Sequence, residues 1–319
     1  MVYAGAALLL AVLLSPFVAS AQAYPSKPVR LLIPWPPGGS NDVVGRIVFQ
    51  KVSESVGQQF PIDNRGGAAG TIGAAVFAKS APDGYTVMVH TSTHLGNAHL
   101  YKKLPYDTLK DFIGVTPLVK QVGVLVVHPS LPAKSVKEFI ALAKARPGEI
   151  VYASTGSGGT AHLAMALFNS MTRTRMVHVP YKGGGPAGIA VVGGESQALI
   201  ASMAVVGPYL IQKRVRPLAV TSDARVKALP DVPAVAETVP GYESTAWVGT
   251  FLPPETPKPI VEKLSAEIKK ALEHPEVVKK LNDIAFEPMY MTPEQFAQRL
   301  KSDYDKSAKM IALAGAKAE

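Results

Sequence analysis

The stretch of sequence that decides the fold is VRLLIPWPPGGSND, residues 29–42. Residues 29–34 form a short, mostly apolar run that predicts a buried strand, and apolar residues recur at helical spacing from Val43 to Val52. A glycine-rich loop joins the two, with Ser40 or Asn41 as the predicted N-cap of the helix. The stretch therefore predicts a strand, a loop and a helix, which together form the repeating unit of α/β proteins.

The same unit returns in the second half of the chain. Residues 150–153 predict a strand, STGSGGT at 154–160 a glycine-rich loop, and residues 162–171 a helix. Because two similar units imply two similar halves, we expect an α/β fold of two lobes, each a mostly parallel sheet flanked by helices. The length of 319 residues also exceeds the usual size of a single hydrophobic core.

Two chain crossings are expected between the lobes. The β-branched run at residues 119–127 predicts the first crossing. The helical region from Pro257 onward has no third sheet to cover, so we expect it to return to the first lobe. The predicted domains are residues 24–123 together with 244–319, and residues 124–243. Two crossings predict a hinge.

The N-terminus predicts export. Residues 4–21, AGAALLLAVLLSPFVASA, carry no charge, and AQA at residues 21–23 is a typical cleavage pattern. A permanent membrane anchor needs about 20 apolar residues, whereas Pro16 and nearby polar residues interrupt this run. We therefore expect residues 1–23 to be a signal peptide that is cleaved after Ala23.

Composition excludes several kinds of site. The chain has no cysteine, which excludes a disulfide framework, a thiol nucleophile and a thiolate metal site. Its formal net charge of +9 attracts anions, but no basic stripe is interleaved with aromatic residues, so we expect no nucleic-acid partner. His94 and His99 have no evident set of further ligands, and we predict neither a metal nor another cofactor.

Both glycine-rich loops are candidate anion sites. Each follows a predicted strand and opens a predicted helix, so backbone N–H groups and the positive end of a helix dipole face the loop. Gly38 and Gly39 allow close approach of a ligand, and Ser40 and the loop at 154–160 add hydroxyl groups. Asp42 could order its loop by accepting N–H bonds or contact ligand through water. Ordinary helix capping is the structural alternative.

At this point the sequence resembles the periplasmic receptors of tripartite tricarboxylate transporters, also called Bug proteins. The resemblance covers essentially the whole mature chain. It is carried by the ordered segments YPSKPVRLLIPWPPGGSND, NRGGAAGTIGA, APDGYTVMV, LPYDTLKDF, YASTGSGGTAHLA, VHVPYKGGGPA, RPLAVTSDARVKALPDVPAVAE and TPEQFAQRL. It implies a Venus-flytrap clamshell of the periplasmic-binding-protein type, a periplasmic location, and capture of a small organic acid for a membrane permease. We expect a monomer.

The resemblance also implies which residues hold a ligand carboxylate, partly through ordered waters. These residues lie in the two glycine-rich loops and in a polar loop at 91–97 that would form a further wall. They are Trp35, Pro36, Ser40, Asn41 and Asp42 in the first loop, Thr155, Ser157 and Thr160 in the second, and Thr91, Ser92 and His94 in the polar loop.

One stretch departs from the family pattern. Many relatives carry an acidic residue followed by Asn where this chain has Ala201 and Ser202. A carboxylate there could receive a ligand ammonium, so its absence favours an acid without an amino group. Met203, Val205 and Val206 would then line an apolar side of the pocket next to Ser202, or alternatively pack in the core.

Two other functions stay open at this stage. An exported α/β enzyme could use the same units, but the loop at 154–160 gives no dinucleotide fingerprint, and no nucleophile elbow surrounds Ser157. A sensor that passes its closed state to a signalling partner has the same sequence features as a transport receptor. We predict a binding protein and not an enzyme.

Two further residues near the glycine-rich segments are expected to have structural roles. His162 is expected to form a hydrogen bond within the loop at 154–160, and Lys182 is expected to lie at the surface.

Overall fold

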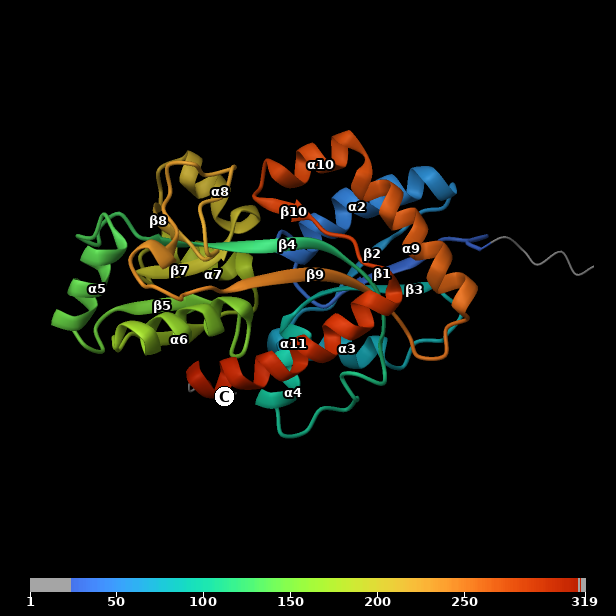
Figure 1. Cartoon of the computed structure of the whole chain (residues 1–319), viewed down its shortest axis with the longest axis horizontal. Coiled ribbons are helices and arrows are strands. Elements are labelled where there is room, and N and C mark those ends of the chain that lie inside the picture. Colours follow the sequence, from blue (N-terminus) through green and yellow to red (C-terminus); the bar gives the residue numbers. More distant parts are fainter. Residues whose placement is uncertain (1–23, 315, 317–319) are drawn as a thin grey trace, which may run out of the picture.

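The predicted strands and helices alternate along the chain, and the structure confirms the α/β class. The protein is described by a computed structural model for residues 24–314 and 316. The predicted signal peptide, residues 1–23 with cleavage after Ala23, lies outside the described residues. The elements form two lobes along the long axis of the molecule (Figure 1).

The elements are short except for one strand and three helices. The strands are β1 (Arg30–Ile33), β2 (Ile62–Asn64), β3 (Thr86–Thr91), β4 (Ile113–Val127), β5 (Val151–Ser154), β6 (Val177–Pro180), β7 (Ala198–Ser202), β8 (Arg216–Val220), β9 (Thr245–Leu252) and β10 (Phe286–Pro288). The α-helices are α2 (Ser40–Val56), α3 (Thr71–Phe77), α4 (Thr93–Leu100), α5 (Val136–Ala145), α6 (Thr160–Thr172), α7 (Gly184–Val192), α8 (Met203–Ile211), α9 (Lys258–Glu273), α10 (Pro275–Asn282) and α11 (Pro293–Ala314). The 3₁₀ helices are η1 (Ala68–Gly70) and η2 (Val235–Glu237).

One mixed sheet runs through both lobes. Its main path is β2-β1-β3-β9-β4-β7-β5-β6, and β8 and β10 pair with β4 off this path. In the first lobe β1 is parallel to β2 and β3, and in the second lobe β5 is parallel to β6 and β7. β4 and β9 are antiparallel to each other and to their other neighbours. The predicted parallel strands thus form the two ends of the sheet, and antiparallel pairs join them.

β4 is the strand that joins the lobes. Residues 113–122 of β4 pair with β9, whereas residues 123–127 pair with β7 and β8. In Figure 1, β4 and β9 run side by side across the middle of the molecule. The long helix α11 packs against β4, α4 and α6, so it spans the same region. The structure thus has two strands and one helix where the lobes meet.

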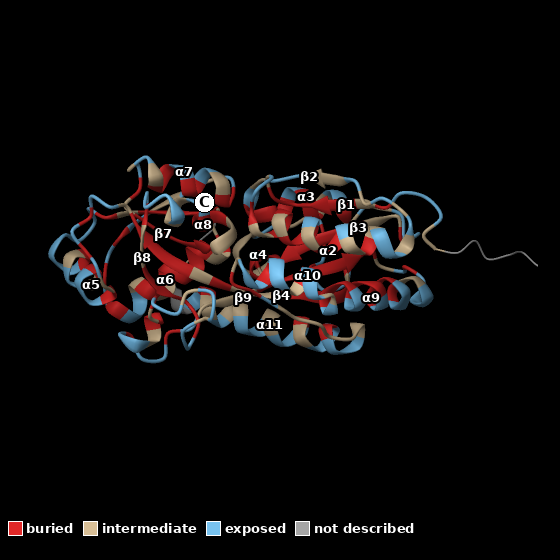
Figure 2. Ribbon diagram, turned by 90° about the horizontal axis from the view of Figure 1, so that it is seen from above, coloured by how far each residue is buried: buried red, intermediate tan, exposed pale blue. Residues whose placement is uncertain are grey.

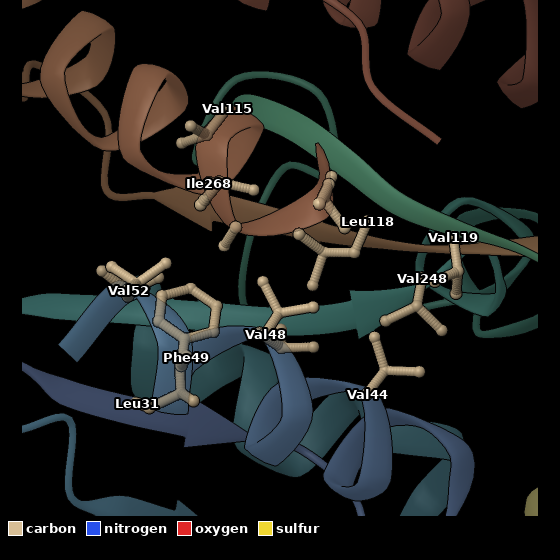
Figure 3. Close-up of a cluster of buried hydrophobic side chains, with 14 of the residues drawn as sticks. Leu31, Val44, Val48, Phe49, Val52, Val115, Leu118, Val119, Val248 and Ile268 are labelled. Atoms are coloured by element: carbon tan, nitrogen blue, oxygen red, sulfur yellow. The ribbon is translucent and has the colours of Figure 1, made fainter. Parts of the chain in front are cut away.

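The core of the first lobe explains the helical pattern that follows the first loop. Val44, Val48 and Val52 lie on one face of α2, are fully buried, and point toward Val119 and Ile268 (Figure 3). Burying each such side chain contributes about 1.5–3 kcal/mol. Figure 2 shows that the central strands are largely buried while the outer faces of helices such as α9 are exposed. This packing holds the N-terminus of α2 in place.

One local prediction was wrong. Residues 91–97 were expected to be a polar loop, but α4 begins at Thr93 because Thr93, Leu95 and Asn97 are buried between neighbouring elements. Within the segment NRGGAAGTIGA, left-handed backbone at Ala69 and Gly70 divides the short 3₁₀ helix η1 from α3. Within the described part of the chain, no helix is both long and apolar enough to cross a membrane.

Candidate functional site

The first loop ends at a helix without a side-chain cap. Gly39, and not the predicted Ser40 or Asn41, is the N-cap of α2, and no side chain caps this end. The first N–H groups of any α-helix have no partner inside the helix, so those of α2 are available to a ligand. Gly38 has a φ of +79°, a left-handed conformation that favours glycine. The sequence therefore builds a turn that exposes backbone donors.

The Asp42 carboxylate stabilises this loop through hydrogen bonds. Its carboxylate accepts hydrogen bonds from the Gly38 backbone N–H at 3.0 Å, from Arg46 Nε and Nη2 at 3.0 Å each, and from Asn64 Nδ2 at 3.2 Å. Burial would raise the pKa of Asp42, but the Arg46 guanidinium and the two further N–H donors outweigh it and lower the pKa. Asp42 thus orders the loop, which is one of the two roles that the sequence left open.

The second loop is held by a pair of histidines. His162 Nδ1 accepts from the Gly158 backbone N–H at 2.9 Å, which is the bond within the loop that the sequence led us to expect. Ser154 Oγ lies 2.6 Å from His178 Nε2, and the two imidazole rings stack with centroids 3.9 Å apart. Gly159 is the N-cap of α6, again without a side-chain cap. Both predicted loops therefore present an uncapped helix N-terminus.

Two more helix N-termini meet at the same place, and sequence reasoning missed both. α7 begins at Gly184 after the N-cap Gly183, and α8 follows the N-cap Ser202; neither end has a side-chain cap. The three glycines at 183–185 have low helix propensity and conceal the start of α7 in the sequence. The signal that could have revealed α7 is the helical spacing of Ala187, Ala190 and Val191, which are all buried.

These ends surround a cavity of about 40 Å³, called here the small cavity. It receives side chains from both lobes, and Ser40 Oγ of α2 lies 2.8 Å from Ser202 Oγ of β7. Its lining consists of Trp35, Pro36, Gly39, Ser40, Asn41, Thr91, Gln121, Thr155, Thr160, Ala161, Gly184, Ile200, Ala201, Ser202 and Val205. None of these described residues is charged. Most of the predicted site residues therefore lie together.

Four residues that line the small cavity carry polar atoms without a hydrogen-bond partner. Asn41 Oδ1, Thr91 Oγ1, Gln121 Oε1 and Thr155 Oγ1 are buried and have no hydrogen bond within the described residues. Leaving a buried polar group unsatisfied costs about 1–3 kcal/mol. A ligand or water that bonds to these groups would remove that cost.

Several predicted residues do not line the small cavity. Asp42 and Ser157 are absent from its lining, as are Met203 and Val206, whereas Val205 is present. Met203 and Val206 pack in the core of the second lobe, the alternative that the sequence left open. Lys182 is exposed, as expected. The small cavity is thus lined by only part of the predicted set of site residues.

His94 is the clearest departure from the predicted site. It is fully buried, its ring centroid lies 4.3 Å from that of Phe112, and its Nε2 lies 3.2 Å from the Thr108 carbonyl oxygen. Burial lowers the pKa of His94 to about 4. His94 lines neither the small cavity nor its larger neighbour, so the predicted wall is wrong at this residue, because α4 turns its side chain into the aromatic core.

A cavity of about 510 Å³, called here the large cavity, adjoins the small one. The two share Gln121, Thr160, Ala161, Ile200, Ala201 and Ser202 in their linings. Ser92, another predicted site residue, lines only the large cavity. Among the residues that the structure describes, no cluster of three or more His, Asp or Glu side chains could hold a metal ion.

Comparison with known proteins decides the family. Residues 44–315 match the tripartite tricarboxylate transporter family receptor. The chain belongs to this family. Its relatives include Protein BugT of Bordetella pertussis, which is 34% identical over 301 residues that cover 93% of this chain and 92% of BugT. The resemblance stated from the sequence is confirmed.

Solved structures of relatives agree with the fold of this receptor. A Rhodopseudomonas palustris protein solved with adipate is 33% identical, has a TM-score of 0.90, and is matched over 93% of this chain and all of that one. MatC of the same organism, solved with bound malate, is 29% identical with a TM-score of 0.85, over 90% of this chain and all of MatC. The family consists of solute-binding proteins and not enzymes, as predicted, and the two-lobed clamshell is confirmed.

Proposed function

We propose that this receptor captures a small organic acid without an amino group and holds one of its carboxylates in the small cavity. The observation that carries the proposal is the meeting of four helix N-termini without side-chain caps, those of α2, α6, α7 and α8, around an uncharged lining. A helix N-terminus offers unpaired N–H donors and a positive dipole, both of which favour an anion.

The expected hydrogen-bond energies are sufficient for micromolar binding of a carboxylate. Each hydrogen bond to a charged group contributes roughly 1.5–3 kcal/mol, and micromolar affinity needs about 8 kcal/mol net. Backbone donors from α2 and α6, with the hydroxyls of Ser40, Thr155 and Thr160, provide several such bonds to one carboxylate. The adipate and malate bound by relatives support a carboxylate ligand.

The lining of the small cavity also supports a ligand without an amino group. The resemblance places Ala201 and Ser202 where many relatives carry an acidic residue and Asn, and no acidic residue lines the small cavity among those described. An ammonium placed there would lose its hydration without gaining a counter-charge.

Binding between lobes gives a mechanism for delivery. We propose that residues 24–123 with 244–319 and residues 124–243 are the two domains, which close around the ligand by bending near the change of partners on β4. A ligand that contacts both lobes stabilises the closed state by its differential affinity. The closed monomer would deliver the acid to a tripartite tricarboxylate permease in the membrane, after export to the periplasm and removal of residues 1–23.

A matched pair of ligands tests the function. We expect succinate to raise the melting temperature of the purified receptor in a concentration-dependent way, and aspartate, which differs by one amino group, to leave it unchanged. The same screen should include malate, adipate and monocarboxylates, since any of these acids would support the proposal. A stronger response to aspartate than to succinate would refute the amine-free part, and no response to any acid would refute the whole.

A further inference from the structure

The small cavity is too small for a whole ligand. A water molecule needs roughly 10–15 Å³ of such volume, so a cavity of about 40 Å³ holds about three waters, or one carboxylate group. The rest of the acid must lie elsewhere. The large cavity adjoins through six shared lining residues, and its 510 Å³ is within the usual range for ligand pockets.

The large cavity combines apolar walls with a group of charges. Leu95 of α4, Leu163 of α6, Ile200 of β7 and Met310 of α11 provide apolar surface that suits a hydrocarbon chain. The charged residues of its lining are the cations Lys120, Arg299 and Lys306 and the carboxylates Glu243 and Asp303. Three positive and two negative side chains leave an excess of one positive charge.

Asp303 holds the Nε edge of the Arg299 guanidinium and leaves its terminal NH₂ groups unpaired among the described residues. Arg299 Nε donates to Asp303 Oδ2 at 2.6 Å, and Trp247 Nε1 donates to the same oxygen at 2.9 Å. Lys306 Nζ lies 3.8 Å from Asp303 Oδ1. The terminal NH₂ groups of Arg299 have no hydrogen bond to any described residue. A guanidinium held by one edge can offer its remaining donors to a carboxylate.

Lys120 lies on the same wall. It is directly opposite Trp247 in the antiparallel pair of β4 and β9, so both side chains project from the same face of the sheet. Its ammonium makes no ion pair or hydrogen bond with the residues that the structure describes, and Lys120 is one of the residues that line the large cavity. Lys120 is opposite Trp247 in the strand pairing, and Arg299 is linked to Trp247 through Asp303. Both cations therefore line the large cavity, Lys120 without a partner and Arg299 with one edge paired.

We propose that Lys120 and Arg299 form a second anion subsite, which binds the distal carboxylate of a dicarboxylic acid with an apolar chain. This inference rests on the proposed function, because the first carboxylate is the one held in the small cavity. Glu243, the other carboxylate of the large cavity, accepts a hydrogen bond from Thr245 Oγ1 at 3.2 Å and has no ion pair with Lys120 or Arg299 among the described residues. Selectivity for chain length would follow from the separation of the two subsites.

Calorimetric titration with two ligand series tests the subsite. The dicarboxylates run from succinate to suberate, and each is paired with the monocarboxylate of the same length, from butyrate to octanoate. The Lys120→Met variant is expected to lose about ten- to hundredfold in affinity for the best dicarboxylate and less than about twofold for its monocarboxylate partner. Arg299→Met should do the same, and Lys120→Met carries the test if Arg299→Met fails to fold.

Lys301→Met is the matched control. Lys301 is exposed on α11, outside the lining of either cavity, and its loss removes the same charge. An equal effect of Lys301→Met would show a general charge effect and overturn the subsite, as would unchanged selectivity in Lys120→Met. If wild type binds monocarboxylates as tightly as dicarboxylates, this inference alone is wrong. If it binds neither series, the proposed function is wrong as well.

Discussion

The double variant Ser40→Leu with Thr155→Leu is expected to bind its acid at least about 100-fold more weakly than wild type. Two hydroxyl donors are lost, and two leucine side chains would fill a cavity of about 40 Å³ that now has room for one carboxylate. Calorimetry with the best ligand of the thermal screen measures the loss.

The fold should survive this change. Both side chains are half-buried at the start of loops or helices, outside the hydrophobic clusters. Ser302→Leu, on the exposed side of α11, is the matched control and should keep wild-type affinity. A folded double variant with unchanged affinity would contradict the placement of the carboxylate.

The second large effect is a loss of folding stability at low pH that arises from buried His94. Because burial lowers the pKa of His94 to about 4, the folded state takes up its proton only at a lower pH than the unfolded state, whose histidine pKa is about 6.5. The contribution of neutral His94 is therefore complete above pH ~6.5 and is lost as pH falls toward 4. The loss is on the order of 3 kcal/mol, at about 1.4 kcal/mol per pK unit.

Urea unfolding of wild type and His94→Phe across this pH range measures the effect. The variant should show a smaller fall in unfolding free energy with decreasing pH, because it lacks one buried group that protonates. At neutral pH its ligand affinity should stay within about twofold of wild type, since His94 contacts Phe112 and the Thr108 carbonyl and neither cavity. An equal pH dependence in both proteins, or a tenfold loss of affinity, would contradict this assignment.

The sequence predicted the parts of the fold that repeat simple patterns. The strand before Trp35 and the helix after Gly39 follow from apolar spacing, and the second glycine-rich loop follows from its likeness to the first. The predicted N-cap, Ser40 or Asn41, lies one or two residues after the observed one, because both residue types are good caps by themselves. Here Ser40 Oγ instead bonds across the lobes to Ser202.

The parts that could not be predicted depend on tertiary contacts. α7 begins in a run of glycines with low helix propensity, and its burial against the sheet stabilises it. His94 lies in a polar sequence but packs among aromatic rings from distant segments. The large cavity combines Lys120 of β4 with Arg299 of α11, residues whose proximity no local pattern reveals.

The most direct test of the central claim is a crystal structure of the receptor with its best-binding acid. We predict one carboxylate in the small cavity, with its oxygens about 2.7–3.2 Å from backbone nitrogens in the first turns of both α2 and α6. A carboxylate bound outside this cavity, or contacted by only one of the two helices, would contradict the account.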